Sequence, residues 1–166
     1  MSEPSSRVML AIDFPQGRLN LRAAAIVLRE GHVLVHQGNG ENHWTLPGGR
    51  VELFEPSSTA LQRELEEELA ETTTIGPLRF LVESFFSHEG HRFHELGFYY
   101  AVALSEKFPF ALHQVVHEIE DGVHLSFRWV AADPESLAAI NFVPAALRPL
   151  LRDTASEMLH IIQVEP

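Results

Sequence analysis

The segment from Gly48 to Glu71 constrains this chain most, because a glycine turn there runs into a strongly acidic helix. The sequence predicts that helix over Ser57–Glu71, where leucines recur at every fourth residue and form one apolar stripe. A second stripe carries acids at positions i, i+3, i+4 and i+7, namely Glu64, Glu67, Glu68 and Glu71. Their mutual repulsion costs on the order of 1 kcal/mol in total. A bound hard cation such as Mg²⁺ or Mn²⁺ would offset that cost.

The residues before the helix favour the same interpretation. Pro47, Gly48 and Gly49 form a turn that lets backbone atoms approach a ligand closely. Pro56 suits the entry to a helix, and the serine that follows it offers an N-cap hydroxyl. A turn, a loop and an acidic helix are therefore expected in immediate succession.

The spacing from Gly49 onward resembles the Nudix box, Gly-x5-Glu-x7-Arg-Glu-U-x-Glu-Glu-x-Gly-U, in which U is an aliphatic residue. The matching positions are Gly49, Glu55, Arg63, Glu64, Leu65, Glu67 and Glu68. Two positions depart from the pattern, because Ala70 stands in place of Gly and Glu71 in place of an aliphatic residue. We expect Ala70 to extend the helix where Gly would end it.

The resemblance implies a hydrolase of phosphoric anhydride bonds, which cleaves the diphosphate of a nucleoside diphosphate linked to another group. It also implies dependence on Mg²⁺ or Mn²⁺. Glu67 and Glu68 are then the main metal ligands, and the carbonyl of Gly48 is a further one. Glu64 serves either as a ligand or as the base that takes the proton of the attacking water.

Other members of the box are expected to be structural. Arg63 pairs with Glu55 in this interpretation and pins the loop to the helix, while Gly49 forms the turn. A distant carboxylate often completes such a site, and Glu118 ranks first in the acidic loop that also holds Glu120 and Asp121. The alternative for these acids is a solvated loop.

Three residues are candidates for substrate binding: Arg50, Trp44 and His94. Trp44 could stack on a base, although most aromatic residues on strands belong to the core. A zinc site formed by His88, His91 and His94 is disfavoured, because odd separations along strands point to opposite faces.

Composition limits the function further. The chain has 166 residues, which suits one domain over residues 1–166. Its net charge of −11 argues against general nucleic-acid binding. It contains no cysteine, which excludes disulfides and the catalytic cysteine that a resemblance to isopentenyl diphosphate isomerase would imply. Without a signal-peptide pattern or a membrane-length apolar run, a cytoplasmic protein is expected.

The predicted elements alternate between strands and helices. Strands are expected at 21–28, 33–36, 44–46, 78–87, 93–104 and 125–130, with a break at Gly76-Pro77 and a loop over 107–121. A short helix begins near Pro134, a longer one is expected from Ala145 to about Leu159, and the last residues look frayed. This order predicts an α/β (α+β) fold, an α/β/α sandwich with a mixed sheet, as the Nudix resemblance also implies.

One alternative function stays open at this point. A Nudix-fold module that binds nucleotides or regulates, and has lost catalysis, would share the fold. The identity of the nucleoside diphosphate derivative does not follow from the sequence. A homodimer is possible, because dimers are common in the family.

Overall fold

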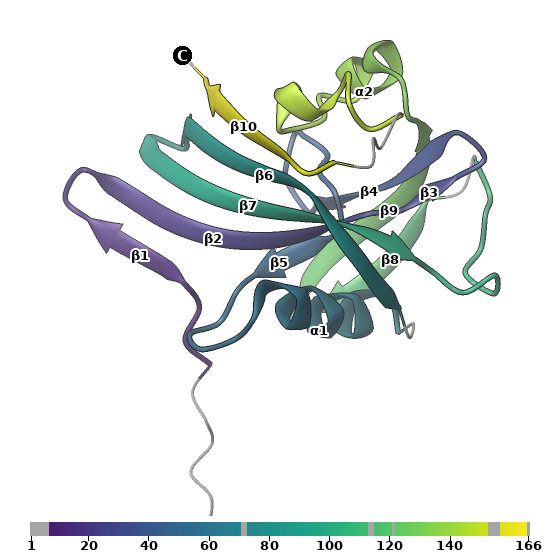
Figure 1. Cartoon of the computed structure of the whole chain (residues 1–166), viewed down its shortest axis with the longest axis horizontal. Coiled ribbons are helices and arrows are strands. Elements are labelled where there is room, and N and C mark those ends of the chain that lie inside the picture. The colour runs from purple at the N-terminus through teal and green to yellow at the C-terminus, as the bar shows by residue number, and fades with distance from the viewer. Residues whose placement is uncertain (1–6, 71–72, 113–114, 121, 153–156, 166) are drawn as a thin grey trace, which may run out of the picture.

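The computed structural model describes residues 7–70, 73–112, 115–120, 122–152 and 157–165 of the chain. Two β-sheets form the framework of this part (Figure 1). The first sheet has the order β1-β2-β7-β6-β10, and β5 also pairs with β2; the second has the order β3-β4-β9-β8. The strands are β1 (Ala11–Phe14), β2 (Gly17–Ile26), β3 (Leu28–Arg29), β4 (His32–Gly38), β5 (Gly48–Arg50), β6 (Thr74–His88), β7 (His91–Ala103), β8 (Val116–Glu120), β9 (Val123–Ala131) and β10 (Leu159–Val164).

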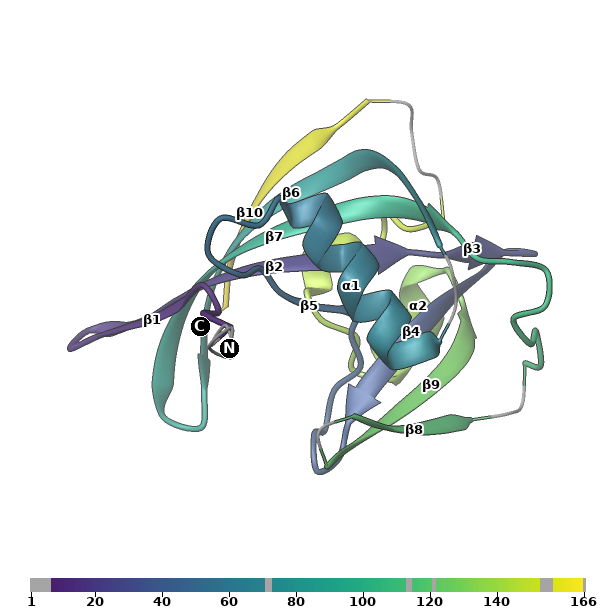
Figure 2. The ribbon, with the colours of Figure 1, turned by 90° about the horizontal axis from the view of Figure 1, so that it is seen from below.

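The first sheet is mixed and lies between helices. β2 pairs with β7 in parallel, as β6 does with β10, whereas the other pairs are antiparallel. Helix α1 (Ser57–Leu69) lies on one side, and α2 (Pro134–Ala139) with the 3₁₀ turn η1 (Ala145–Leu147) lies on the other (Figures 1 and 2). The expected α+β sandwich with a mixed sheet is confirmed. No helix in these described residues is long and apolar enough to cross a bilayer.

Alternation along β2 divides the core into two parts. Ala23 and Ala25 face α1, where they pack with Leu61 and Leu65 of the apolar helix stripe. The intervening Ala24 belongs to the other cluster, together with residues of α2 and the segment that follows it. Each fully buried leucine contributes roughly 1.5–3 kcal/mol of apolar burial, so this packing fixes α1 on the sheet.

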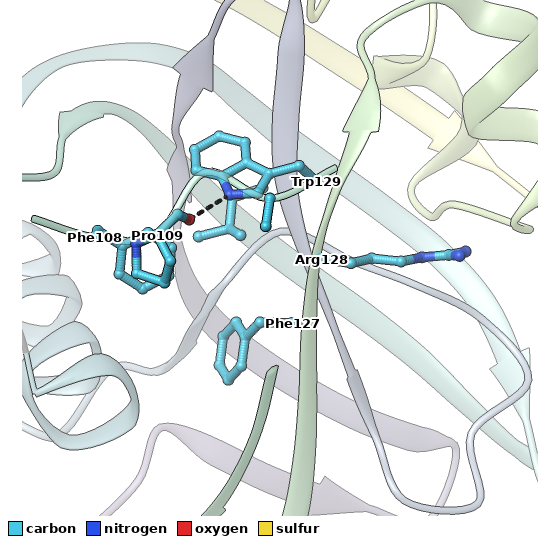
Figure 3. Close-up of a pocket in the computed structure, with 7 residues that line it drawn as sticks. Phe108, Pro109, Phe127, Arg128 and Trp129 are labelled. Carbon is cyan, nitrogen blue, oxygen red and sulfur yellow. Dashed lines mark hydrogen bonds between the residues drawn. The ribbon is translucent and has the colours of Figure 1, made fainter. Parts of the chain in front are cut away.

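Strand β9 separates a packed aromatic side from a cationic one (Figure 3). Trp129 donates its indole N–H to the carbonyl of Pro109 at 3.0 Å, and this bond holds the 105–112 segment on the strand. Arg128 points the opposite way and lies 4.4 Å from the ring centre of Trp44. The cavity beside Trp129 measures about 10 Å³, which is far too small for a substrate.

The C-terminal prediction was wrong. The expected helix from Ala145 to about Leu159 is replaced by the short turn η1, and the end of the chain forms β10, parallel to β6, rather than a frayed tail. Pro149 explains the loss of the helix, because its ring removes an amide donor and clashes with the preceding turn.

Several smaller boundaries also differ from the expectation. No strand was expected before residue 21, but β1 and the start of β2 lie there. Strand β8 occupies part of the expected 107–121 loop. Gly76 and Pro77 lie inside β6, which continues past them with shifts in its register to β7. The expected strand 44–46 is reduced to isolated bridges. These strands depend on backbone pairing with distant partners, which local patterns do not show.

Both ends of α1 depart from the expectation. The helix ends at Leu69, and Ala70 does not extend it: Ala70 takes the left-handed conformation with φ of 51°, which Gly usually supplies at this point. At the other end, the residue at the N-cap is Pro56, which offers no side-chain hydrogen bond to the helix. The hydroxyl of Ser57 instead bonds to the hydroxyl of Tyr100 at 2.6 Å.

Replacing Ala70 by Gly is expected to stabilise the protein by about 1 kcal/mol, because a side chain in the left-handed region carries a steric penalty of that size. Urea denaturation measures the change in unfolding free energy. The matched control is Gln62→Gly, at an exposed position inside α1, which should instead destabilise by roughly 1 kcal/mol. Equal destabilisation by both variants would contradict the strain at Ala70.

Candidate active site

Two glycines bring the acidic helix against the sheet. Gly48 pairs with Ala24 of β2 and has φ of 149°, and a Cβ there would overlap the carbonyl oxygen of Ala23. Gly49 lies under α1, where a Cβ would overlap the carboxylate of Glu64. Close approach of the neighbouring backbone therefore requires glycine at position 48, whereas a side chain at position 49 would displace the Glu64 carboxylate from its place under Arg63.

Arg63 ties the loop after β5 to α1. Its Nε and Nη2 atoms each donate to one oxygen of Glu55 at 3.0 Å, and Nη2 also lies 3.3 Å from the carbonyl of Arg50. Glu55 in turn accepts the backbone N–H of Glu52 at 3.0 Å. The Arg63 hydrogen bonds lower the pKa of Glu55, so the pair stays ionised. A bidentate pair of this kind fixes both groups in direction as well as in distance.

The three acids predicted to be catalytic lie within two turns of α1 and differ in environment. Glu64 is 8% exposed, and its Oε1 accepts from Arg63 Nη1 at 2.6 Å; burial raises its pKa, and the Arg63 bond opposes that rise. Glu68 is 5% exposed, and burial raises its pKa to about 8. Glu67 is more open, and Arg7 and Arg63 approach it at 2.9 and 3.6 Å.

Two residues that sequence reasoning missed lie behind Glu68. Arg22 of β2 contacts Nε2 of His36 at 3.2 Å and also donates to the carbonyl of Leu46 at 3.1 Å. Nδ1 of His36 lies 3.6 Å from Oε2 of Glu68. Burial, with Arg22 adding to it, lowers the pKa of His36 to about 3, so the ring is neutral. Because Arg22 donates to Nε2, the proton sits on Nδ1 and faces the carboxylate. Arg22, His36 and Glu68 are far apart in the sequence, and no local pattern predicts that they meet.

The chemistry of these acids fits a divalent cation. Oε2 of Glu68 is buried and forms no hydrogen bond within the part of the chain that the structure describes, an arrangement that is costly for a carboxylate unless a cation or water supplies a partner. Carboxylate oxygens are ligands that Mg²⁺ prefers, and Mg²⁺ usually keeps several waters, so few protein ligands suffice. Within the described ranges, no three His, Asp or Glu side chains are grouped so that all could hold one ion.

The side chains of three remaining predicted residues, Arg50, Trp44 and His94, make contacts away from the acids. Arg50 points its side chain into a cleft at the hairpin tips, and Trp44 is covered by Arg128. His94 packs against Phe85, with ring centres 4.4 Å apart, at an exposed position of β7. Glu118 lies on β8, a strand in contact with α1, but its side chain is outside the described part of the structure.

Comparison with known proteins gives the family. Residues 19–151 match the family model described as NUDIX domain. The chain belongs to this family. The Nudix assignment from the box is thus confirmed, and the chain is a Nudix hydrolase, an enzyme acting on phosphoric anhydride bonds. No curated protein matches the sequence of this Nudix chain.

Solved structures share the Nudix fold at low sequence identity. The mMutator MutT protein of Bacillus halodurans is 15% identical, with a TM-score of 0.57 over 89% of this chain and 91% of that one. A NUDIX hydrolase of Nitrosomonas europaea is also 15% identical, with a TM-score of 0.57 over 92% and 82%. An ADP-ribose pyrophosphatase of Streptococcus suis is 14% identical, with a TM-score of 0.51 over 86% and 98%.

The buried Glu68 predicts a pH-dependent stability in the Nudix chain without metal. Its folded-state pKa of about 8 lies above the ordinary value of 4.5, so the folded state binds more protons than the unfolded state between these values. The contribution of Glu68 to stability is therefore full below pH 4.5 and is lost as pH rises towards 8. The variant Glu68→Gln lacks this titration, so its stability relative to wild type should increase across that window.

Thermal unfolding in the presence of a chelator, from pH 5 to pH 8, measures this difference. His36 titrates in both proteins and largely cancels in the comparison. A melting-temperature difference that stays constant with pH would show that the carboxyl of Glu68 is not held protonated by burial.

Proposed function

We propose that this chain is a divalent-metal-dependent pyrophosphohydrolase that cleaves the diphosphate of a nucleoside diphosphate linked to another group. The observation that carries the proposal is the buried pair Glu64 and Glu68: Glu64 lies against Gly49 of the glycine turn, and one carboxylate oxygen of Glu68 has no partner among the described residues. A site of this kind is costly to fold, so a ligand that uses it is the simplest account.

Glu67 and Glu68 would hold Mg²⁺ or Mn²⁺, with the carbonyl of Gly48 and a carboxylate such as Glu118 as further ligands. Bound divalent ions neutralise diphosphate charge and lower the pKa of a coordinated water. Two observations support Glu67 and Glu68 as ligands: the side chain of Glu67 is partly exposed, and Oε2 of Glu68 forms no hydrogen bond among the described residues.

Glu64 is the base in this proposal. Arg63 holds its Oε1, which favours the ionised form and fixes the direction of the carboxylate, and leaves Oε2 to accept a proton. Water attacks one phosphorus atom and gives that proton to Glu64, while the bond from this phosphorus to the bridging oxygen breaks. Two phosphorylated products leave. Burial of Glu64 raises its pKa, which suits a group that accepts a proton near neutral pH.

The small-molecule substrate is a nucleoside diphosphate derivative in this proposal. One structural neighbour is described as an ADP-ribose pyrophosphatase, which makes ADP-ribose a suitable first compound to test. The net charge of −11 disfavours a capped RNA end.

The variant Glu67→Gln is expected to lose at least about a hundredfold in turnover, because a lost metal ligand removes stabilisation made mainly in the transition state. Phosphate-bond cleavage is measured on a panel of nucleoside diphosphate derivatives with Mg²⁺ and with Mn²⁺. The matched control is Glu66→Gln. Glu66 lies between Glu64 and Glu67 in the sequence, but its side chain is exposed and accepts a hydrogen bond from Gln62.

If wild type shows no metal-dependent cleavage of any compound but binds nucleotides, the chain is a silent binding module instead. If Glu66→Gln and Glu67→Gln lose activity equally, the assignment of Glu67 as a ligand is wrong.

A further inference from the structure

A cleft at the tips of two hairpins is not used by the proposed chemistry. The β1–β2 turn and the β6–β7 turn lie next to each other at one end of the first sheet (Figures 1 and 2). They are so close that a Cβ on Gly17 would be 2.7 Å from the carbonyl oxygen of Arg92. Between them and Arg50 of β5 lies a cavity of about 690 Å³. A volume of this size suits a small molecule.

The cleft gathers cations in a chain that is otherwise strongly acidic. Three of the twelve Lys and Arg residues line it, namely Arg18, Arg50 and Arg92, together with His88 and His91. Arg18 is already used, because it forms a bidentate pair with Asp13 at 2.7 and 2.9 Å.

Arg50 and Arg92 are different. Neither guanidinium forms an ion pair with any carboxylate among the described residues, although Asp13 and Glu89 line the same cleft. Guanidinium groups bind phosphate oxygens through two parallel hydrogen bonds. Phe14, which is 55% exposed, and Phe93 add apolar surface to the same wall. Two unpaired cations beside aromatic rings suit a phosphate that carries an organic group.

We propose that this hairpin cleft is a binding site for a phosphorylated ligand, with Arg50 and Arg92 as the groups that hold its phosphate. Arg50 follows Gly49 directly, so strand β5 links the cleft to the glycine turn. The phosphate could therefore belong to a distal part of the substrate or to a separate phosphorylated molecule.

Binding of inorganic pyrophosphate to the full chain, in the presence of a chelator, tests the site. Without metal there is no catalysis, so the result does not depend on the proposed hydrolysis. Amide ¹H–¹⁵N spectra should show shifts at Gly17, Gly90 and Arg92, and the affinity should fall with added salt. The dissociation constant should rise roughly tenfold in Arg92→Gln and in Arg50→Gln, as expected for loss of a charged hydrogen bond.

The charge-matched control is Lys107→Gln, because Lys107 is exposed and does not line the cleft. It should bind pyrophosphate as wild type does, and the spectra of all variants report whether they are folded. Absence of binding, or binding that is equal in Arg92→Gln and wild type, would overturn the proposal.

Steady-state kinetics with Mg²⁺ then distinguish the two sources of the phosphate. A raised KM with unchanged kcat in Arg92→Gln assigns the cleft to the distal part of the substrate. Unchanged kinetics, combined with the lost pyrophosphate binding, assign it to a separate phosphorylated ligand. Both results support the site itself.

Discussion

The Arg63 guanidinium is the interaction on which the rest of the site depends. It bonds to the Glu55 carboxylate, the carbonyl of Arg50 and the Glu64 carboxylate, so one side chain joins the end of β5, the following loop and α1. Each charge-assisted bond is worth roughly 1.5–3 kcal/mol. The larger effect of these bonds is on geometry. They fix the position of the loop relative to α1, and this position holds the Glu64 carboxylate next to Gly49.

Burial of the acids works against this stabilisation. Glu64 and Glu68 are largely removed from water, and this unfavourable desolvation of the charged forms is the main cause of their raised pKa values. The apolar stripe of α1, with Leu61 and Leu65 fully buried, fixes the helix despite this cost. Apolar burial on one side of α1 thus stabilises the fold, and burial of acids on the other side destabilises it, as expected where a site is preorganised for a ligand.

The sequence was most informative where function imposes spacing. The turn at Gly48 and Gly49, and the acids of α1 with Arg63, follow a local pattern, so the fold class and the family could be predicted from it. Features set by distant contacts could not. The parallel strand β10 depends on pairing with β6, and the partnership of Arg22 and His36 with Glu68 joins three elements. Ala70 shows a third limit, because helix propensity alone favoured continuation while the observed chain turns away in the left-handed conformation.

The neutral ring of His36 has a consequence for the charge of its neighbour. It lies between Arg22 and Glu68, so the guanidinium and the carboxylate, which would otherwise neutralise each other, are kept apart by an uncharged spacer. Direct contact would satisfy the acid internally and leave it little affinity for anything else. With imidazole interposed, the carboxyl of Glu68 is oriented without a direct ion pair, and an incoming cation would favour its charged form.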